Sequence, residues 1–202
     1  MRYLALDLGS SWTKTALLED GNVLQERSVP TPMPKDTTGL RFEIDAEAYF
    51  RQVQTELEYY LPQKPGALLL STQMHGCVLT DAAFQPLTPY ISWRDGMGQN
   101  RLEDICTLVG KDATAPSGVP LKGNLALCAL LSRRMSGDAL PVRARFCTLG
   151  GYVIGRLTGE HVCHMTNAAP TGLVDVQNKR WSKEMLEICG LTEDQMPELH
   201  ES

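Results

Sequence analysis

Short runs of apolar residues, separated by turn-forming residues, organise the N-terminal part of the chain. The run Tyr3–Leu6 ends at Asp7, and a Gly-Ser-Ser turn separates it from a second run, Thr15–Leu18. Because both runs suit strands, and glycine and serine favour tight turns, this pattern predicts a β-hairpin. A second turn, at Asp20–Asn22, leads into Val23–Val29, where alternating residues predict a third strand. The N-terminal segment is therefore expected to form three antiparallel strands.

After the three predicted strands, the spacing of apolar residues changes from the two-residue repeat of a strand to the repeat of a helix. After Asp45, a typical helix N-cap, apolar residues recur at helical spacing from Ala46 to Leu61, and Pro62 ends the pattern. The following run, Gly66–Leu70, is wholly apolar, which predicts a parallel strand covered on both faces. Three antiparallel strands followed by a helix and a helix-covered parallel strand resemble the start of a ribonuclease-H-like α/β domain. This domain is the half-unit of the actin, hexokinase and Hsp70 superfamily.

Polar residues gather at the tip of the predicted hairpin. Gly9, Ser10 and Ser11 supply backbone N–H groups and two hydroxyls, and Lys14 adds a positive charge. Such a concavity suits phosphate oxygens, and Asp7 at the end of the first strand could hold a hydrated metal ion. The alternative is an ordinary hairpin, in which Asp7 accepts hydrogen bonds from the turn and only fixes its shape.

A second polar segment follows Leu70, at the expected carboxyl end of the apolar strand, where α/β sheets bind their ligands. Gln73 and His75 can hydrogen-bond hydroxyl groups, and Met74 offers an adaptable apolar wall. Gly76 permits close approach of the backbone. The segment therefore predicts a site for a hydroxylated ligand. The alternative is a plain connection between two strands, with a histidine of no special function.

Trp93 and Asp95 form an aromatic–acid pair further along the chain. Proteins hold sugars in this way, because the ring packs on C–H faces while the carboxylate accepts from hydroxyls. The alternative places Trp93 in the core and makes Asp95 the cap of a helix over 97–109. Asp95 could serve both purposes.

Composition and charge narrow the class of protein. The chain has 202 residues, 43% of them hydrophobic and 21% charged, so it can bury a core, most simply as one domain. Its net charge is −5 and its basic residues are dispersed, which argues against a nucleic-acid-binding surface. Asp7 interrupts the first apolar run, so no signal peptide is expected, and the longest run, 125–131, is too short to cross a bilayer. We therefore expect a cytoplasmic globular protein without a membrane partner.

Six cysteines occur without any Cys-x-x-Cys pair, and most lie in apolar surroundings, so they are expected to be reduced and buried. One cluster, His161, Cys163 and His164, hints at a metal site. Residues so close together in a strand or turn cannot all face one ion, so zinc is not expected there. Other nucleotide signatures fail, because no G-x-x-x-x-G-K-[ST] occurs and Gly96-Met-Gly98 lacks the third glycine of a dinucleotide fingerprint.

Several motifs together resemble one family. The segments 7–11, 73–76 and 93–95 occur in the order and spacing of the FGGY carbohydrate kinases, and Gln-Met-His-Gly is most similar to the xylulokinase branch. The C-terminal part agrees with the same family over Gly151–Glu160, Thr166–Ala168, Thr171–Asp175, Trp181–Ser182 and Met196–Leu199. The chain is therefore identified as a member of this family, through a resemblance that covers almost its whole length.

The resemblance implies a kinase that uses ATP and Mg²⁺ to phosphorylate a hydroxyl of a sugar or polyol between two domains. It makes Asp7 a catalytic residue, the acidic side chain that is associated with magnesium. It assigns Ser10 and Ser11, on the turn that begins at Gly9, to the phosphates, and it makes Lys14 a nucleotide contact.

On the substrate side, the resemblance makes Met74 and His75 the sugar-binding pair. In related polyol kinases a tyrosine beyond a Gly-x-Pro-Leu loop touches the substrate, whereas here Gly118–Leu121 leads to Asn124. An asparagine can still hydrogen-bond hydroxyls, but the change argues against glycerol, and we expect a ketose such as xylulose. The expected substrate-binding residues are Gln73, Met74, His75, Trp93, Asp95 and Asn124.

Family features expected beyond Met196–Leu199 do not occur in the sequence. The general base of the family is an aspartate in a Gly-rich segment after this stretch, and the sequence ends at Ser202. The second, nucleotide-binding domain is absent as well. Residues 1–202 are therefore expected to form an N-terminal kinase domain that is incomplete at its C-terminal end and inactive alone.

Two other functions stay open at this point. A non-catalytic lobe could bind a sugar or a partner chain without turnover. An ATPase of the actin or Hsp70 type would share the hairpin, but it would need neither segment 73–76 nor segment 93–95. A homodimer is also left open.

Overall fold

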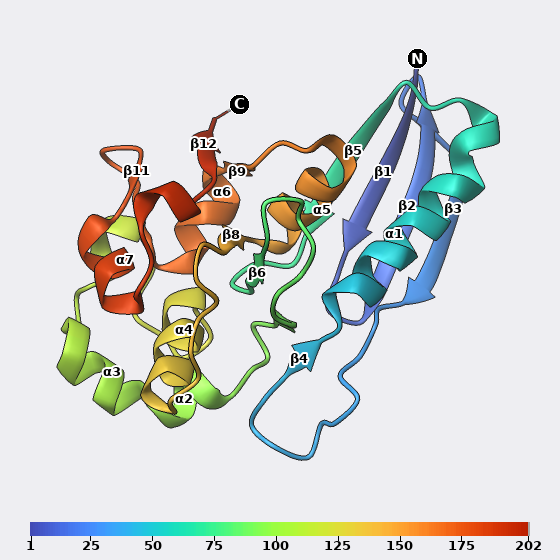
Figure 1. Ribbon diagram of the computed structural model, residues 1–202. Coiled ribbons are helices and arrows are strands. Elements are labelled where there is room, and N and C mark those ends of the chain that lie inside the picture. The colour runs from blue at the N-terminus through green and yellow to red at the C-terminus, as the bar shows by residue number, and fades with distance from the viewer. Residues whose placement is uncertain (202) are drawn as a thin grey trace.

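The computed structural model describes residues 1–201, which form a sheet with a covering helix and a mostly helical second half (Figure 1). The sheet has four strands in the order β3-β2-β1-β5, with β1, β2 and β3 antiparallel and β5 parallel to β1. These strands are β1 (Arg2–Leu8), β2 (Trp12–Glu19), β3 (Asn22–Pro30) and β5 (Ala67–Thr72). The predicted arrangement is confirmed, and the first three strands extend beyond their apolar runs.

Helix α1 (Ala46–Tyr60) covers one face of this sheet (Figure 1). Asp45 caps it, because its Oδ1 accepts hydrogen bonds from the backbone N–H groups of Glu47 and Ala48. The apolar side of the helix and the facing strand residues share one core cluster, which includes Leu6, Leu8, Ile44, Tyr49, Phe50 and Val53. Burial of this apolar side is what holds α1 against the sheet.

The opposite face of the sheet carries exposed side chains. Ala5 and Ala16 pair at its centre, and Leu69 on β5 is 50% exposed. The apolar run of β5 predicts a strand that is covered on both faces. Within residues 1–201, only one of its faces is covered. An apolar run shows that both faces of a strand are suited to burial, but it does not show which segment covers each face.

Outside the four-stranded sheet and α1, the chain combines helices with short two-stranded ladders (Figure 1). These helices are α2 (Met97–Asn100), α3 (Leu102–Val109), α4 (Ala126–Met135), α5 (Leu149–Thr158), α6 (Met165–Ala168) and α7 (Lys183–Cys189). The 3-10 turns are η1 (Leu61–Gln63), η2 (Ala115–Ser117), η3 (Ala169–Thr171) and η4 (Glu193–Gln195). The paired short strands are β4 (Glu43–Ile44) with β7 (Tyr90–Ile91), β6 (Val78–Thr80) with β8 (Arg145–Cys147), β9 (Val162–His164) with β12 (Glu198–His200), and β10 (Val174–Asp175) with β11 (Arg180–Trp181).

The helix predicted over 97–109 is divided at Arg101 into α2 and α3. Arg101 has φ −112° and ψ 17°, which lies outside helical geometry. Gly98 in α2 lies so close to Gly123 and Cys128 that any side chain there would overlap them. This contact holds α2 against the start of α4, and the chain bends at Arg101 before α3 begins.

All six cysteines are unpaired, and burial raises the pKa of the Cys77, Cys128 and Cys147 thiols to about 12. The expectation of buried cysteines is confirmed for all but Cys106, which is partly buried. Among residues 1–201, no helix combines the length and apolarity needed to cross a membrane.

Candidate active site

The turn between β1 and β2 leaves donors free at its tip. Gly9 closes the turn by donating its N–H to the Trp12 carbonyl at 3.1 Å, and a Cβ at Gly9 would lie 2.7 Å from that oxygen. Only glycine therefore fits this position. Within residues 1–201, the N–H groups of Ser10 and Ser11 donate to no backbone carbonyl, so they can bind an anion.

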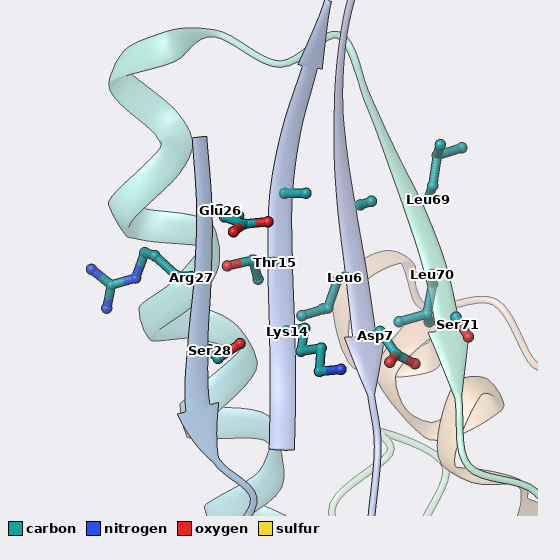
Figure 2. Close-up of a pocket in the computed structure, with 12 residues that line it drawn as sticks. Leu6, Asp7, Lys14, Thr15, Glu26, Arg27, Ser28, Leu69, Leu70 and Ser71 are labelled. Atoms are coloured by element: carbon teal, nitrogen blue, oxygen red, sulfur yellow. The ribbon is translucent and has the colours of Figure 1, made fainter. Parts of the chain in front are cut away.

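Asp7 lies beside this turn, on the face of the sheet away from α1. It pairs across the strands with Lys14 on one side and with Ser71 on the other, and Lys14 pairs with Ser28. Figure 2 shows this polar row along a shallow groove of about 660 Å³, with the Lys14 side chain extended towards Asp7. In the described part of the chain, the Asp7 carboxylate has neither a hydrogen-bond donor nor an ion-pair partner, so it is available to a ligand.

The segment after β5 bends sharply at His75. This residue has φ +68°, and a side chain at Gly76 would overlap the Tyr90 hydroxyl. Burial lowers the pKa of His75, the backbone of Pro170 opposes this shift, and the charge of Lys122 adds to it. The lowered pKa favours the neutral form of the His75 ring, whose buried Nδ1 has no hydrogen-bond partner among residues 1–201.

Gln73 is engaged with protein groups on several sides. Its backbone N–H donates to the Leu8 carbonyl at 2.9 Å, which joins the end of β5 to the end of β1. Its side-chain Nε2 donates to the Tyr49 hydroxyl at 2.5 Å and to the Gly9 carbonyl at 3.5 Å. Its Oε1 accepts from the Ser92 hydroxyl at 3.5 Å. These contacts occupy the amide that the sequence assigns to the sugar.

Asp95 is also occupied, although Trp93 two residues before it is 39% exposed and available for stacking. The carboxylate of Asp95 accepts from the backbone N–H groups of Phe42 at 2.8 Å and Met97 at 3.0 Å, and it forms an ion pair with Arg133. The alternative interpretation expected Asp95 to support the following helix, and Asp95 does accept from Met97, the first residue of α2. It also expected Trp93 to be a core residue, whereas Trp93 is partly exposed.

Arg133 is a residue that sequence reasoning missed. Its guanidinium lies between Asp95, at 2.8 Å, and Glu43, at 2.7 Å, and its side chain is 6% exposed. Burial lowers the pKa of Arg133, but the two carboxylates outweigh burial and raise it overall. Its place in α4 carried a signal, because it falls on the same apolar side as Ala126 and Leu130. A charge on an apolar helix side indicates a buried partner.

The remaining predicted sugar contacts, Asn124 and Met74, are not engaged by other protein groups of residues 1–201. Asn124 lies just before α4, and its side-chain Oδ1 is buried without a partner among residues 1–201. Met74 is 47% exposed. Both residues can therefore contact a ligand without breaking an existing interaction.

The histidine–cysteine cluster serves structural purposes. The Nε2 of His161 forms a hydrogen bond with the Phe146 carbonyl at 2.9 Å, and Cys163 is buried. The Nδ1 of His164 caps α6 and contacts the Thr166 hydroxyl at 2.8 Å. Across residues 1–201, no group of three or more His, Cys, Asp or Glu side chains could hold a metal ion by itself. A magnesium ion at Asp7 would therefore depend on water and phosphate for its other ligands, as Mg²⁺ commonly does.

Comparison with known proteins places this geometry in a family. The sequence model of one protein family, the N-terminal domain of the FGGY family of carbohydrate kinases, matches residues 2–202. Xylulose kinase from Escherichia coli K12 is 31% identical over an aligned length of 214 positions, covering 98% of this chain and 42% of the relative. Gluconokinase from Bacillus subtilis is 26% identical, covering 97% of this chain and 39% of the relative. The chain thus spans less than half the length of these relatives.

A solved structure supports the fold assignment. Gluconate kinase from Lactobacillus acidophilus superposes with a TM-score of 0.87 at 24% identity, over 98% of this chain and 42% of that one. This similarity, together with the family match, confirms the predicted ribonuclease-H-like α/β fold.

Proposed function

This chain belongs to the FGGY family of carbohydrate kinases, and from that premise we propose that it is the N-terminal lobe of an enzyme that phosphorylates a sugar. ATP is the phosphate donor, and the acceptor is a hydroxyl of a ketose such as xylulose. The observation that carries the proposal is the adjacency of two sites. The anion-binding turn and the polar segment after β5 stand at the ends of neighbouring parallel strands, joined by the Gln73–Leu8 hydrogen bond.

The hairpin forms the phosphate end of the proposed site. The free N–H groups of Ser10 and Ser11, with their hydroxyls, bind phosphate oxygens, and Lys14 supplies positive charge. The unpaired carboxylate of Asp7 would hold a hydrated Mg²⁺ ion, which would supply positive charge to neutralise the phosphate oxygens. Gly9 allows the turn to close tightly behind these groups.

The segment after β5 forms the sugar end. His75 and Asn124 hydrogen-bond hydroxyl groups through atoms that otherwise lack partners, while Met74 and Trp93 pack against the C–H faces of the sugar. Asp95 takes part by holding the loop that carries Trp93.

The rest of the catalytic machinery belongs to a longer protein in this proposal. Phosphoryl transfer needs a group that accepts the hydroxyl proton and groups that position the nucleotide. The lengths of the relatives support a second lobe that supplies both. A cytoplasmic location is part of the same proposal, and the unpaired, mostly buried cysteines are typical of it.

A second candidate is a lobe that binds a partner chain without turnover. The open face of the sheet favours it, because Leu69 is half exposed beside the small residues Ala5 and Ala16.

The proposal is tested by ADP release from the full-length protein with a panel of ketoses, polyols and gluconate. A ketose should stimulate ADP release well above the sugar-free rate. No stimulation by any member of the panel would contradict a sugar kinase and favour the partner-binding lobe.

Residues 1–202 alone should show no sugar-dependent ADP release above background, because the proposal assigns the catalytic base and part of the nucleotide site to the second lobe. The measurement compares the short and full-length proteins with the same sugars. Turnover by the short chain at a rate near that of the full-length protein would show that the catalytic base lies within these residues.

Replacing His75 with alanine should weaken sugar binding by about 10-fold, because the variant loses a hydrogen bond from a half-buried site. Ligand-observed NMR with D-xylulose compares the wild type with His75→Ala. The exposed residue His200 on β12 offers a matched control, and His200→Ala should bind as the wild type does. Equal binding by all three proteins would remove His75 from the sugar site.

A further inference from the structure

The side chain of Gln73 touches three separate parts of the fold. Its Nε2 donates to Tyr49 on α1 and to the Gly9 carbonyl in the hairpin turn, and its Oε1 accepts from the Ser92 hydroxyl just before Trp93. The shortest of these contacts, 2.5 Å to the Tyr49 hydroxyl, is made to a fully buried tyrosine. Gln73 thus lies at the junction of the proposed phosphate and sugar ends.

The partners of Gln73 are themselves fixed. The Gly9 carbonyl also accepts from the Thr31 hydroxyl at 2.9 Å, and the N–H of Thr31 donates to the Ser11 carbonyl at 3.0 Å, so the turn is held from both sides. On the other side, the Ser92 hydroxyl accepts from the Arg94 N–H at 3.3 Å. A shift of Gln73 would therefore reach the turn and the Trp93 segment together.

We propose that Gln73 is a positioning residue that sets the distance between the phosphate-binding turn and the sugar pocket and does not itself contact the sugar. The inference rests on the proposed kinase function. Its amide is fully engaged with protein partners, because Nε2 donates to Tyr49 and Gly9 while Oε1 accepts from Ser92. Phosphoryl transfer depends on alignment of the two reactants, so a small error in this distance is expected to slow the chemical step.

The test uses the full-length protein with Gln73→Met and Gln73→Glu. Methionine keeps the length of the side chain without its hydrogen bonds, and glutamate keeps the acceptors but loses the donor. Gln195 provides a matched control, because its Nε2 donates to the Ala144 carbonyl at 2.8 Å and its Oε1 accepts from Thr192, outside the proposed site. Both Gln73 variants should lose roughly 10- to 100-fold in kcat with a sugar KM within about 3-fold of wild type. Gln195→Met should keep the wild-type kcat.

Amide hydrogen exchange gives a readout that does not depend on turnover. In Gln73→Met, exchange should increase both in the turn at Gly9–Ser11 and in the segment Ser92–Asp95, whereas Gln195→Met should change neither. Faster exchange at only one of the two segments, or at neither, would overturn the linking role.

Other outcomes separate this inference from the proposed function. A raised sugar KM with unchanged kcat would mean that Gln73 binds the sugar directly, which contradicts a positioning role. If the Gln73 variants and Gln195→Met lose kcat equally, Gln73 contributes only to general stability, and the positioning role is overturned. A wild-type protein that phosphorylates no sugar would overturn the proposed function and the catalytic part of this inference, while hydrogen exchange would still decide whether Gln73 links the two segments.

Discussion

Replacing Arg133 with methionine is expected to lower the free energy of unfolding by about 3–5 kcal/mol, because it leaves a buried carboxylate without its positive partner. The Asp95 side chain is 2% exposed, and Arg133 provides both its ion pair and two of its hydrogen bonds. The backbone N–H groups of Phe42 and Met97 would remain, but they carry no net charge to balance the carboxylate. Urea unfolding of the wild type and Arg133→Met measures this loss.

The neighbouring arginine supplies a control for this prediction. Arg134 lies at the surface, and its guanidinium donates to the Ile188 carbonyl at 2.6 Å, at the end of α7. Arg134→Met removes the same chemical group from an exposed contact, so its effect on unfolding should be much smaller. Equal losses of unfolding free energy in Arg133→Met and Arg134→Met would show that the buried Arg133–Asp95 pair has no special importance for stability. The loss of unfolding free energy in Arg133→Lys should lie between those of Arg133→Met and Arg134→Met. Lysine keeps the positive charge, but it cannot form the two parallel hydrogen bonds to the oxygens of Asp95.

Replacing Asp7 with asparagine is expected to reduce kcat of the full-length protein by roughly 10²-fold or more, because metal-assisted charge neutralisation is worth several kcal/mol. An amide keeps the shape of the side chain and loses the charge. Since the Asp7 carboxylate has no partner among residues 1–201, folding should be almost unchanged. Steady-state turnover together with thermal unfolding measures both quantities.

Asp20→Asn serves as the control for Asp7. Asp20 stands in the turn after β2, with its side chain 80% exposed, and its only described ion pair is with the N-terminal amine. This variant should keep wild-type turnover. If Asp7→Asn instead melts early and keeps normal activity per folded molecule, Asp7 has the structural role that the hairpin pattern alone allows.

Local chemistry explains why the N-terminal half could be predicted from the sequence. The turn at Gly9 and the cap at Asp45 depend on residues within a few positions of each other, and the structure shows both. The position of the segment after β5, at the carboxyl end of a parallel strand, follows from strand order in the same way.

Long-range partners could not be predicted from the sequence. The pattern identified Gln73 and Asp95 as polar residues in the right places, but it could not show that Tyr49 and Arg133 would occupy them. These partners lie 24 and 38 residues away in the chain, and no local spacing relates them. The same limit applies to β5, since its apolar run could not show which segment covers its second face.

³¹P NMR of the full-length protein with ATP, Mg²⁺ and D-xylulose follows the phosphoryl group from donor to acceptor. We predict a sugar phosphomonoester resonance that grows in step with ADP, because the two proposed sites hold the phosphate donor and the sugar side by side. ADP accompanied only by inorganic phosphate, at a rate that the sugar does not change, would contradict the account and indicate an ATPase built on the same hairpin.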